Sequence, residues 1–287
     1  MKISIIIVTY NSMRLIKDCI DSIYKYSDLK EDEFEIIVVD NSSFEEGEII
    51  KDFLEKEYSN KIIFFKNENL GYGHGNNIGI RNATGDIIAI MNPDVRLIEP
   101  MFQKTLSHFS DKNIATVGFS QKNGSTDYSF FIKPEFFIPL YSSYKLKIDN
   151  KLKQFDPRIH YLSGAFVFFR KTDFEKIGLY DESIFMYFEE PDVALRLEKL
   201  GKSTIFDSTK SYIHLIEVKD AYNVRLLDIG TEAIKVYFTK HQFNLKNYLS
   251  KRFIELRFHK FLFTITGNKD RVEMAKAYIN SLRKIKG

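Results

Sequence analysis

The 287-residue sequence has a single cysteine, no tryptophan and no long apolar run. Because Cys19 has no partner in the chain, an intramolecular disulfide cannot form, which favours a reducing compartment. No apolar stretch approaches the roughly 20 residues that a membrane-spanning helix needs. The first apolar stretch, 3–8, is too short for the core of a signal peptide. We therefore expect a cytoplasmic protein.

Several short catalytic motifs are also missing. The sequence has no P-loop, no Gly-x-Ser-x-Gly nucleophile turn and no Cys/His spacing typical of zinc sites. The turn after the first expected strand, Tyr10-Asn11-Ser12, contains no glycine, although a dinucleotide-binding fold needs its Gly-x-Gly-x-x-Gly there. This argues against a nicotinamide or flavin dehydrogenase. A nucleotide that is bound by side chains remains compatible with the sequence.

Charge is distributed unevenly along the chain. The net charge is +3, but residues 240–287 contain twelve Lys and Arg against three acids, so this end is +9 and the rest is −6. A basic, aromatic-bearing end favours binding to an anionic membrane surface. There, Phe253, Leu256, Phe261 and Leu262 are the expected apolar stripe; the alternative is a packed helical pair with a solvated basic face. We expect no nucleic-acid partner and leave a homodimer open.

Short apolar runs alternate with segments of helical periodicity up to about residue 220. The runs that predict strands are 3–8, 35–39, 62–65, 87–91, 115–119, 161–169 and 202–206. This alternation predicts an α/β fold, a Rossmann-like doubly wound and mostly parallel sheet. The stretch 121–157 is aromatic and irregular, and the pattern beyond 221 is helical, with a break near 267–268. We expect a domain over 1–220 and a basic helical region over 221–287.

Polar residues follow three of the expected strands. The apolar run 87–91 stops at Asn92-Pro93-Asp94, where Pro93 cannot donate to a sheet ladder. Thr9 and Asp40 end two other strands, and ligands bind at this carboxyl edge of open α/β sheets. Our hypothesis is that Asp94 holds a divalent metal that carries a nucleotide-sugar diphosphate. The alternative is a simple Pro-Asp turn.

Two further stretches could carry chemistry. The glycine-rich run 71–79 precedes a short helix, with Asn76 and Asn77 where that helix is expected to begin. It is either a flexible turn or a close approach of backbone to a ligand. Glu189-Glu190-Pro191-Asp192 opens another helix, and its acids are either capping charges or include a general base, since adjacent acids raise each other's proton affinity.

Taken in order, these motifs resemble family 2 glycosyltransferases of the GT-A fold, and in particular bacterial rhamnosyltransferases of surface-polysaccharide assembly. The likeness covers about residues 3–245. The matching stretches are Val8-Thr9-Tyr10-Asn11, Val38-Val39-Asp40-Asn41-Ser42-Ser43, Asn69-Leu70-Gly71, Gly75-Asn76-Asn77-Ile78-Gly79, Met91-Asn92-Pro93-Asp94, Ser163-Gly164-Ala165, Glu189-Glu190-Pro191-Asp192 and His214.

The resemblance implies a role for each matching position. Residues implied to bind the nucleotide or the donor sugar are Thr9, Tyr10, Asn11, Asp40, Asn41, Asn69, Gly71, Gly75, Asn76, Asn77, Asn92 and Gly164. Asp94 and His214 are implied to hold Mg²⁺ or Mn²⁺. Glu190 falls on the position of the catalytic base, with Glu189 and Asp192 orienting the acceptor. Two departures matter. Asn92 is a neutral ligand where the family has an acid, and Glu190 is one methylene longer than the aspartate usual at its position, so the choice between Glu189 and Glu190 stays open.

The implied activity is inverting transfer of a sugar from a nucleotide-diphosphate donor to a hydroxyl of a glycan. The donors left open are dTDP-rhamnose and a UDP-hexose or UDP-galactofuranose. The acceptor is expected to be lipid-linked, in capsule, O-antigen or cell-wall assembly, with the enzyme peripheral at the inner membrane face. The alternatives are a nucleotidyltransferase of sugar-nucleotide metabolism and a catalytically inactive glycan-binding protein of the same fold.

Overall fold

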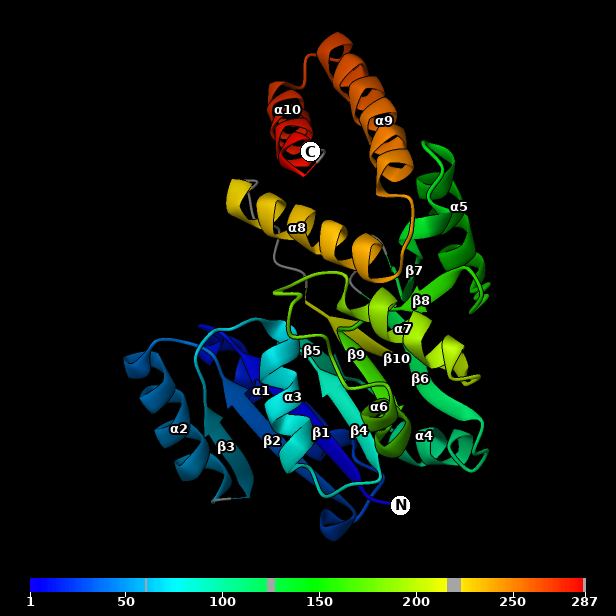
Figure 1. The fold of residues 1–287 in the computed structure, drawn as a ribbon. Helices are drawn as coiled ribbons and strands as arrows, with labels where there is room; N and C mark the ends of the chain where they lie inside the picture. Colours follow the sequence, from blue (N-terminus) through cyan, green and yellow to red (C-terminus); the bar gives the residue numbers. More distant parts are fainter. Residues whose placement is uncertain (60, 123–126, 216–222, 286–287) are drawn as a thin grey trace.

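A computed structural model of the chain describes residues 1–59, 61–122, 127–215 and 223–285 (Figure 1). The strands are β1 (Ile3–Thr9), β2 (Phe34–Asp40), β3 (Ile62–Lys66), β4 (Ile87–Met91), β5 (Val95–Leu97), β6 (Ile114–Lys122), β7 (Phe130–Ile132), β8 (His160–Leu162), β9 (Phe166–Arg170) and β10 (Ser203–His214). The helices are α1 (Met13–Tyr26), α2 (Phe44–Tyr58), α3 (Tyr72–Asn82), α4 (Phe102–His108), α5 (Tyr141–Leu152), α6 (Lys171–Lys176), α7 (Glu189–Lys199), α8 (Val224–Lys240), α9 (Leu245–Ile265) and α10 (Lys269–Lys284), with short 3-10 turns η1 (Glu31–Glu33) and η2 (Pro134–Phe136).

One sheet carries the fold, with the strand order β3-β2-β1-β4-β9-β6-β10-β5. The first four strands pair in parallel, as do β6 and β10. Strand β9 runs antiparallel to both β4 and β6, and β5 runs antiparallel to β10. The expected doubly wound, mostly parallel sheet is confirmed. The antiparallel insertions were not predicted, because an apolar run does not record the direction of its strand.

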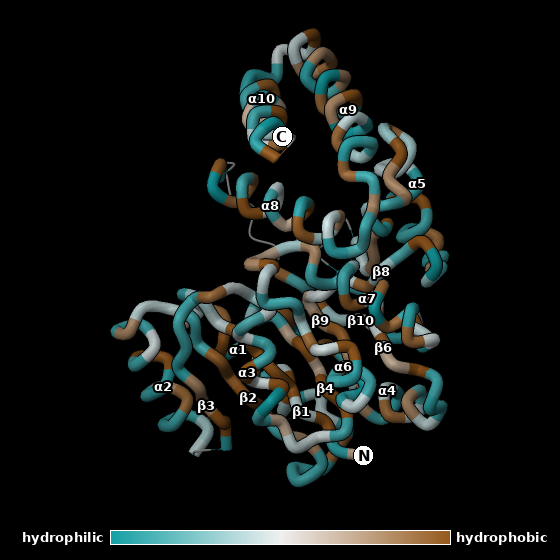
Figure 2. The backbone as a smooth tube through the Cα atoms, viewed as in Figure 1, coloured by the Kyte–Doolittle hydropathy of each residue, from teal (hydrophilic) through white to brown (hydrophobic). Residues whose placement is uncertain are grey.

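Helices cover both faces of this sheet, so its central strands are apolar on both sides (Figure 2). On one face, α1, α2 and α4 pack through residues such as Ile20, Leu54 and Phe102. On the other, α3, α6 and α7 pack through residues such as Ile80, Phe174 and Val193. All five residues of β4 are buried, which accounts for the uninterrupted apolar run before Asn92.

Three segments differ from expectation. The aromatic stretch 121–157, predicted to be irregular, contains β7 and α5. The strand predicted over 161–169 is two strands, β8 and β9, separated by Ser163-Gly164-Ala165. Helix α3 begins at Tyr72 rather than at Asn76, because Gly71 takes a φ of +115° and caps it. The glycine-rich run is therefore largely helix, and Asn76 and Asn77 lie in its second turn.

Helices α8, α9 and α10 enclose a third core, packed mainly by aromatic and large aliphatic side chains such as Tyr237, Phe238 and Leu282. The predicted boundary at 220/221 lies outside the described residues. Phe253 and Leu256, which were predicted to be interfacial, are 8% and 7% exposed and belong to this core. Within the described ranges, no helix is both long and apolar enough to cross a membrane.

Candidate active site

A cavity of about 720 Å³ lies at the carboxyl edge of the sheet, where β4 and β10 end. Its walls come from the start of α3, the break between β8 and β9, the start of α7, the end of β10, and helices α8 and α10. The lining residues are Tyr72, Asn92, Phe131, Tyr161, Ser163, Gly164, Ala165, Met186, Tyr187, Phe188, Glu189, Glu190, His214, Asn223, Leu226, Leu227, Gly230 and Tyr278. The sequence motifs thus meet at one cavity, with aromatic rings on several sides.

The two carboxylates of Glu189 and Glu190 open α7 and line this cavity. Glu189 is 1% exposed, and its Oε1 has no hydrogen-bond partner among the described residues. Burial, followed by the charges of Glu190 and Asp192, raises the pKa of Glu189 well above its ordinary value. Burial likewise raises the pKa of Glu190. A pair of carboxyls that resists ionisation can take up a proton near neutral pH.

Gly164 and Tyr72 fit closely around Glu190 and Asn92. A Cβ atom at Gly164 would lie 2.1 Å from Glu190 Oε1, so only glycine leaves room for this carboxylate. The Tyr72 hydroxyl donates to Asn92 Oδ1 at 2.9 Å and lies 3.3 Å from the Gly164 carbonyl. Burial and the charges of Glu190 and Glu189 raise the pKa of Tyr72 well above its usual value, so Tyr72 stays a neutral donor.

Asp94 and His214 face each other although 120 residues separate them in the sequence. His214 pairs with Val95 at the end of the β10–β5 ladder, which brings its Nε2 to 3.2 Å from Asp94 Oδ1. Asp94 Oδ1 and His214 Nδ1 are buried and lack hydrogen-bond partners among the described residues. An unsatisfied carboxylate oxygen beside an imidazole suits a cation. No group of three or more His, Cys, Asp or Glu in the described ranges could hold a metal ion.

The predicted nucleotide side lies at the ends of β1 and β2. Asp40 is fully buried: it accepts from Thr9 Oγ1 at 2.8 Å and from Ser42 Oγ at 2.7 Å, and Lys66 Nζ lies 3.1 Å away. Tyr10 stands 58% exposed at the same edge. Asn11 takes a positive φ and donates its backbone N–H to Ser42 Oγ at 2.8 Å. Asp40 thus organises this rim through protein contacts.

The residues around α3 contact protein on most sides. A Cβ at Gly71 would lie 2.5 Å from the Phe185 carbonyl oxygen, and one at Gly75 would lie 3.0 Å from Asn41 and Val8. These glycines allow α3 to approach its neighbours closely. Asn77 is buried and bonds both backbone groups of Tyr180 and the Glu182 carboxylate. Asn76 is also buried, with Oδ1 lacking a partner among the described residues, whereas Asn69 is exposed.

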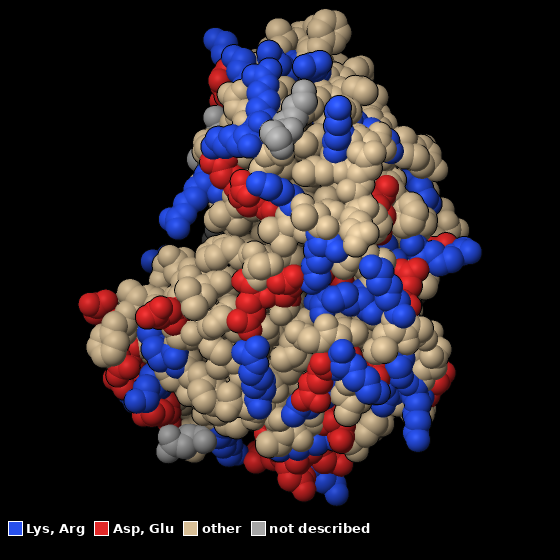
Figure 3. Space-filling model, in the orientation of Figure 1, with Lys and Arg blue, Asp and Glu red and all other residues tan. Residues whose placement is uncertain are grey.

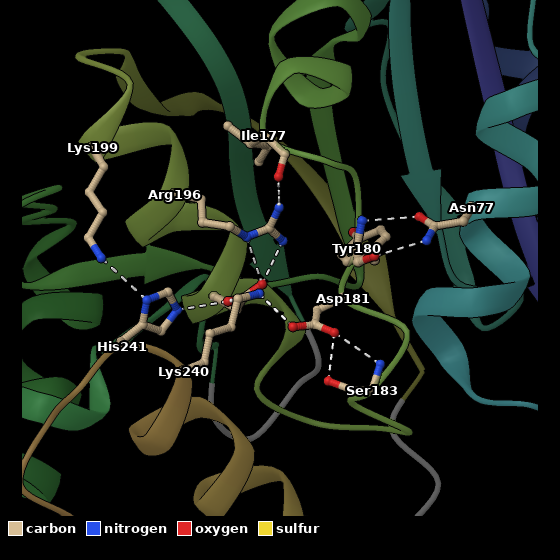
Figure 4. Close-up of polar contacts among 10 residues, drawn as sticks. Asn77, Ile177, Tyr180, Asp181, Ser183, Arg196, Lys199, Lys240 and His241 are labelled. Carbon is tan, nitrogen blue, oxygen red and sulfur yellow. Dashed lines mark hydrogen bonds and ion pairs between the residues drawn. The ribbon is translucent and has the colours of Figure 1, made fainter.

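Asp192 does not line the cavity, although it was predicted to orient the acceptor. It is fully buried and lies among three nitrogen-bearing side chains, Arg196 on its own helix and Lys240 and His241 at the end of α8; Figure 4 labels these three partners. Lys240 Nζ and His241 Nε2 are each 2.8 Å from Asp192 Oδ1. Burial opposes ionisation, but these partners outweigh it and lower the pKa of Asp192 to about 2. Asp192 therefore attaches α7 to the C-terminal helices.

Some site residues were missed from the sequence. Tyr72, Lys66, Tyr161 and Tyr278 contact the cavity or the Asp40 rim, and the last three lie outside the motifs singled out from the sequence. Tyr72 lies inside the glycine-rich run, which is the one local signal that could have drawn attention to it. Tyr278 comes from α10, so only the tertiary fold brings it to the cavity.

The mixed sheet, flanked by helices and with a cavity at the carboxyl ends of its strands, is the architecture of GT-A glycosyltransferases. The family model described as "Glycosyl transferase family 2" matches residues 4–178, more than half of the chain. The chain therefore belongs to glycosyltransferase family 2, and it is a glycosyltransferase.

Known proteins resemble the chain beyond this match. An uncharacterized glycosyltransferase of Rickettsia typhi is 28% identical over 261 residues, covering 84% of this chain and 77% of the relative. Rhamnosyltransferase WbbL of Escherichia coli K12 is 25% identical over 213 residues, covering 69% of this chain and 77% of that relative. A mannosyltransferase from Pyrobaculum calidifontis, solved with GDP-mannose and Mn²⁺, superposes with a TM-score of 0.62 over 99% of this chain and 72% of that one. At 16% identity, this last likeness shows the fold alone.

Proposed function

We propose that this enzyme transfers a sugar, with inversion, from a nucleotide-diphosphate donor to a hydroxyl of a glycan. One observation carries the proposal. The carboxyls of Glu189 and Glu190 line the same cavity as Asn92 and His214, and His214 is paired with Asp94. A proton acceptor and an anion-binding end therefore share one space, which a single-displacement transfer requires.

Glu190 is the proposed base. It takes the proton from the acceptor hydroxyl as that oxygen attacks the anomeric carbon, and the bond to the nucleotide diphosphate breaks on the opposite face. The anomeric configuration inverts and no covalent enzyme intermediate forms. The raised pKa of Glu190 suits this role, because a carboxylate that has lost its hydration takes up a proton more readily. Glu189 lines the same cavity, and burial and the charges of Glu190 and Asp192 raise its pKa well above the ordinary value, so Glu189 favours the neutral form beside the base.

Asp94 and His214 are the proposed ligands of a divalent cation, Mg²⁺ or Mn²⁺, with Asn92 beside them. When bound, such a cation neutralises the charge that develops on the departing diphosphate. The assignment is supported by Asp94 Oδ1, which has no hydrogen-bond partner among the described residues and lies 3.2 Å from His214 Nε2. Because two side chains make a weak cage, the diphosphate has to complete it, and we expect metal affinity to depend on the donor.

The nucleotide is proposed to bind over the Asp40 rim. Thr9, Asn11 and Asn41 surround Asp40 there, and the exposed ring of Tyr10 offers a face for the base. The 25% identity with a rhamnosyltransferase makes dTDP-rhamnose the first donor to test, ahead of UDP-hexoses and UDP-galactofuranose. A lipid-linked acceptor in surface-polysaccharide assembly, reached at the inner face of the membrane, remains our proposal for the other substrate.

The deciding experiment is a donor panel. Purified enzyme is incubated with dTDP-rhamnose, UDP-glucose, UDP-galactose, UDP-galactofuranose, UDP-N-acetylglucosamine and GDP-mannose, each with Mn²⁺, with Mg²⁺ or with EDTA. We expect metal-dependent release of nucleoside diphosphate from one donor above the others. Release of a nucleoside monophosphate and a sugar phosphate would indicate nucleotidyl chemistry instead. Binding without turnover of any donor would favour the inactive glycan-binding alternative.

A further inference from the structure

Helix α9 exposes a continuous apolar face. Ile254, Phe258, Phe261 and Ile265 are 60%, 45%, 64% and 67% exposed, and they follow the i, i+4, i+7, i+11 spacing of one helix face. The opposite face, with Phe253 and Leu256, packs into the third core. Large side chains in such a row are costly to leave in water, so the face is suited to an apolar partner.

The charge on α9 indicates what kind of partner this is. Its sequence has five cations, Lys246, Lys251, Arg252, Arg257 and Lys260, and a single acid, Glu255. Glu255 is buried and pairs with Arg252, which is itself largely buried, so the other four cations remain without an acid on this helix. Figure 3 shows Lys and Arg outnumbering acidic side chains over the C-terminal helices. Apolar side chains flanked by cations match the interface of an anionic bilayer.

A second exposed apolar segment adjoins this face. Phe136, Ile138 and Leu140, which precede α5, are 47%, 49% and 41% exposed. The segment is attached to α9 by two contacts, from Lys251 Nζ to the Phe137 carbonyl at 3.2 Å and from the Leu140 N–H to Glu255 Oε1 at 3.3 Å. Ile254 lies between these two α9 residues in the sequence. The exposed residues of 136–140 therefore lie beside the part of α9 that carries Ile254.

A smaller cavity adjoins the candidate active-site cavity and is lined by residues of the 136–140 segment, of α5 and of α9, including Arg252. Its volume is about 350 Å³, and Ile132, Pro134, Phe137 and Leu146 contribute apolar walls. Phe131, Tyr161 and Phe188 line both this cavity and the catalytic one. An apolar chain lying here would be beside the cavity that Glu190 lines, because Phe131, Tyr161 and Phe188 are common to both.

We propose that α9 and residues 136–140 dock on an anionic lipid bilayer, and that the cavity between α5 and α9 admits the hydrocarbon chain of a lipid-borne acceptor. The inference rests on the proposed function, which requires an acceptor hydroxyl to reach Glu190. It adds the surface that binds the membrane and the route by which the lipid enters.

The absence of tryptophan gives a direct test. Single reporters are introduced as F261W on the docking face, L146W in the small cavity and F44W on α2, where Phe44 is 70% exposed and remote from α9. Each variant is mixed with vesicles of phosphatidylcholine alone or with phosphatidylglycerol, carrying brominated or unmodified acyl chains. With anionic brominated vesicles at low salt, we expect F261W emission to shift to the blue and be quenched, L146W to be quenched, and F44W to be unchanged.

A loss-of-function pair completes the test. F258S/F261S should lower the vesicle-bound fraction at least about tenfold, whereas F44S/I49S on α2 should not. Metal-dependent donor hydrolysis in solution should be unchanged in both, so a failure of docking is distinguishable from a failure of the proposed chemistry. Unquenched F261W would overturn the docking surface, and unquenched L146W the lipid cavity. A concentration-dependent shift of F261W without vesicles, accompanied by dimerisation, would identify a second copy of the chain as the occupant.

Discussion

The two ends of the site are built differently. At the Asp40 rim, the buried carboxylate is matched by Thr9, Ser42 and Lys66 without any ligand. Around the catalytic cavity, Glu189 and Asp94 each leave a buried oxygen without a hydrogen-bond partner in the described part of the chain. Buried polar groups are ordinarily satisfied, because an unpaired one costs free energy. The rim is therefore held by the fold itself, whereas under the proposed function the cavity is completed by its substrates.

The largest effect should come from the proposed base. Glu190→Gln removes the proton acceptor but keeps the shape of the side chain, so we expect transfer to fall by about 10³-fold, with nucleotide binding near wild type. Turnover of the best donor, together with calorimetric binding of its nucleoside diphosphate, measures both. Glu189→Gln is the matched comparison. If it loses more activity than Glu190→Gln, the base is Glu189.

The next largest effect concerns Asp94. Asp94→Asn should reduce metal-dependent turnover by about 10²-fold, because the amide is a weaker ligand for a hard cation. EDTA should abolish turnover of the wild type, and added Mn²⁺ should restore it. Titration of Mn²⁺ by electron paramagnetic resonance should show tight binding only when a nucleoside diphosphate is present. Equal affinity with and without the nucleotide would contradict a site completed by the donor.

Asp192 belongs with the satisfied groups, and its replacement should affect stability. Asp192→Asn leaves Arg196 and Lys240 without their shared anion and, from the lowered pKa of Asp192, should cost about 2 kcal/mol in urea unfolding at neutral pH. Because the pKa of Asp192 is lowered to about 2, its contribution is present above the ordinary value near 3.8 and is lost as the pH falls toward 2. The wild-type advantage over Asp192→Asn should therefore shrink in acid. A gap that persists at pH 2 would argue against an ionic origin.

Replacing Glu189 should give the smallest effect, and it should stabilise the protein rather than destabilise it. The pKa of Glu189 is raised in the folded protein, so folding loses stability as the pH rises above the ordinary value of 4.5. Glu189→Gln removes that charge and should stabilise the protein by on the order of 1 kcal/mol at neutral pH, with little difference below pH 4. Thermal unfolding across this range measures it. Equal stability of the two proteins at pH 7 would mean that folding does not raise the pKa of Glu189.

The sequence predicted the features that depend on neighbouring residues in the chain. The buried strand 87–91 and the break before α10 follow from apolar spacing and from glycine, and their positions are confirmed. The strand pairing was not recoverable, because β9 inserts antiparallel between β4 and β6 through contacts that are remote in sequence. The residues of the candidate site also fall into a predictable and an unpredictable group. Glu190 and His214 could be singled out from motifs, but the ion cluster around Asp192 depends on Lys240 and His241 of another helix.

The catalytic cavity extends well past the stretch that matches the family model, which ends at residue 178. Glu189, Glu190 and His214 lie beyond it, and so do the walls that α8 and α10 provide. Under the proposed function, the Asp40 rim lies within the stretch that the family model matches, and the cavity walls from α8 and α10 lie beyond it. Selection could then change the acceptor of the reaction while leaving the donor-binding residues unchanged. Exchanging α8–α10 between relatives is therefore a rational way to redirect such an enzyme to a new polysaccharide.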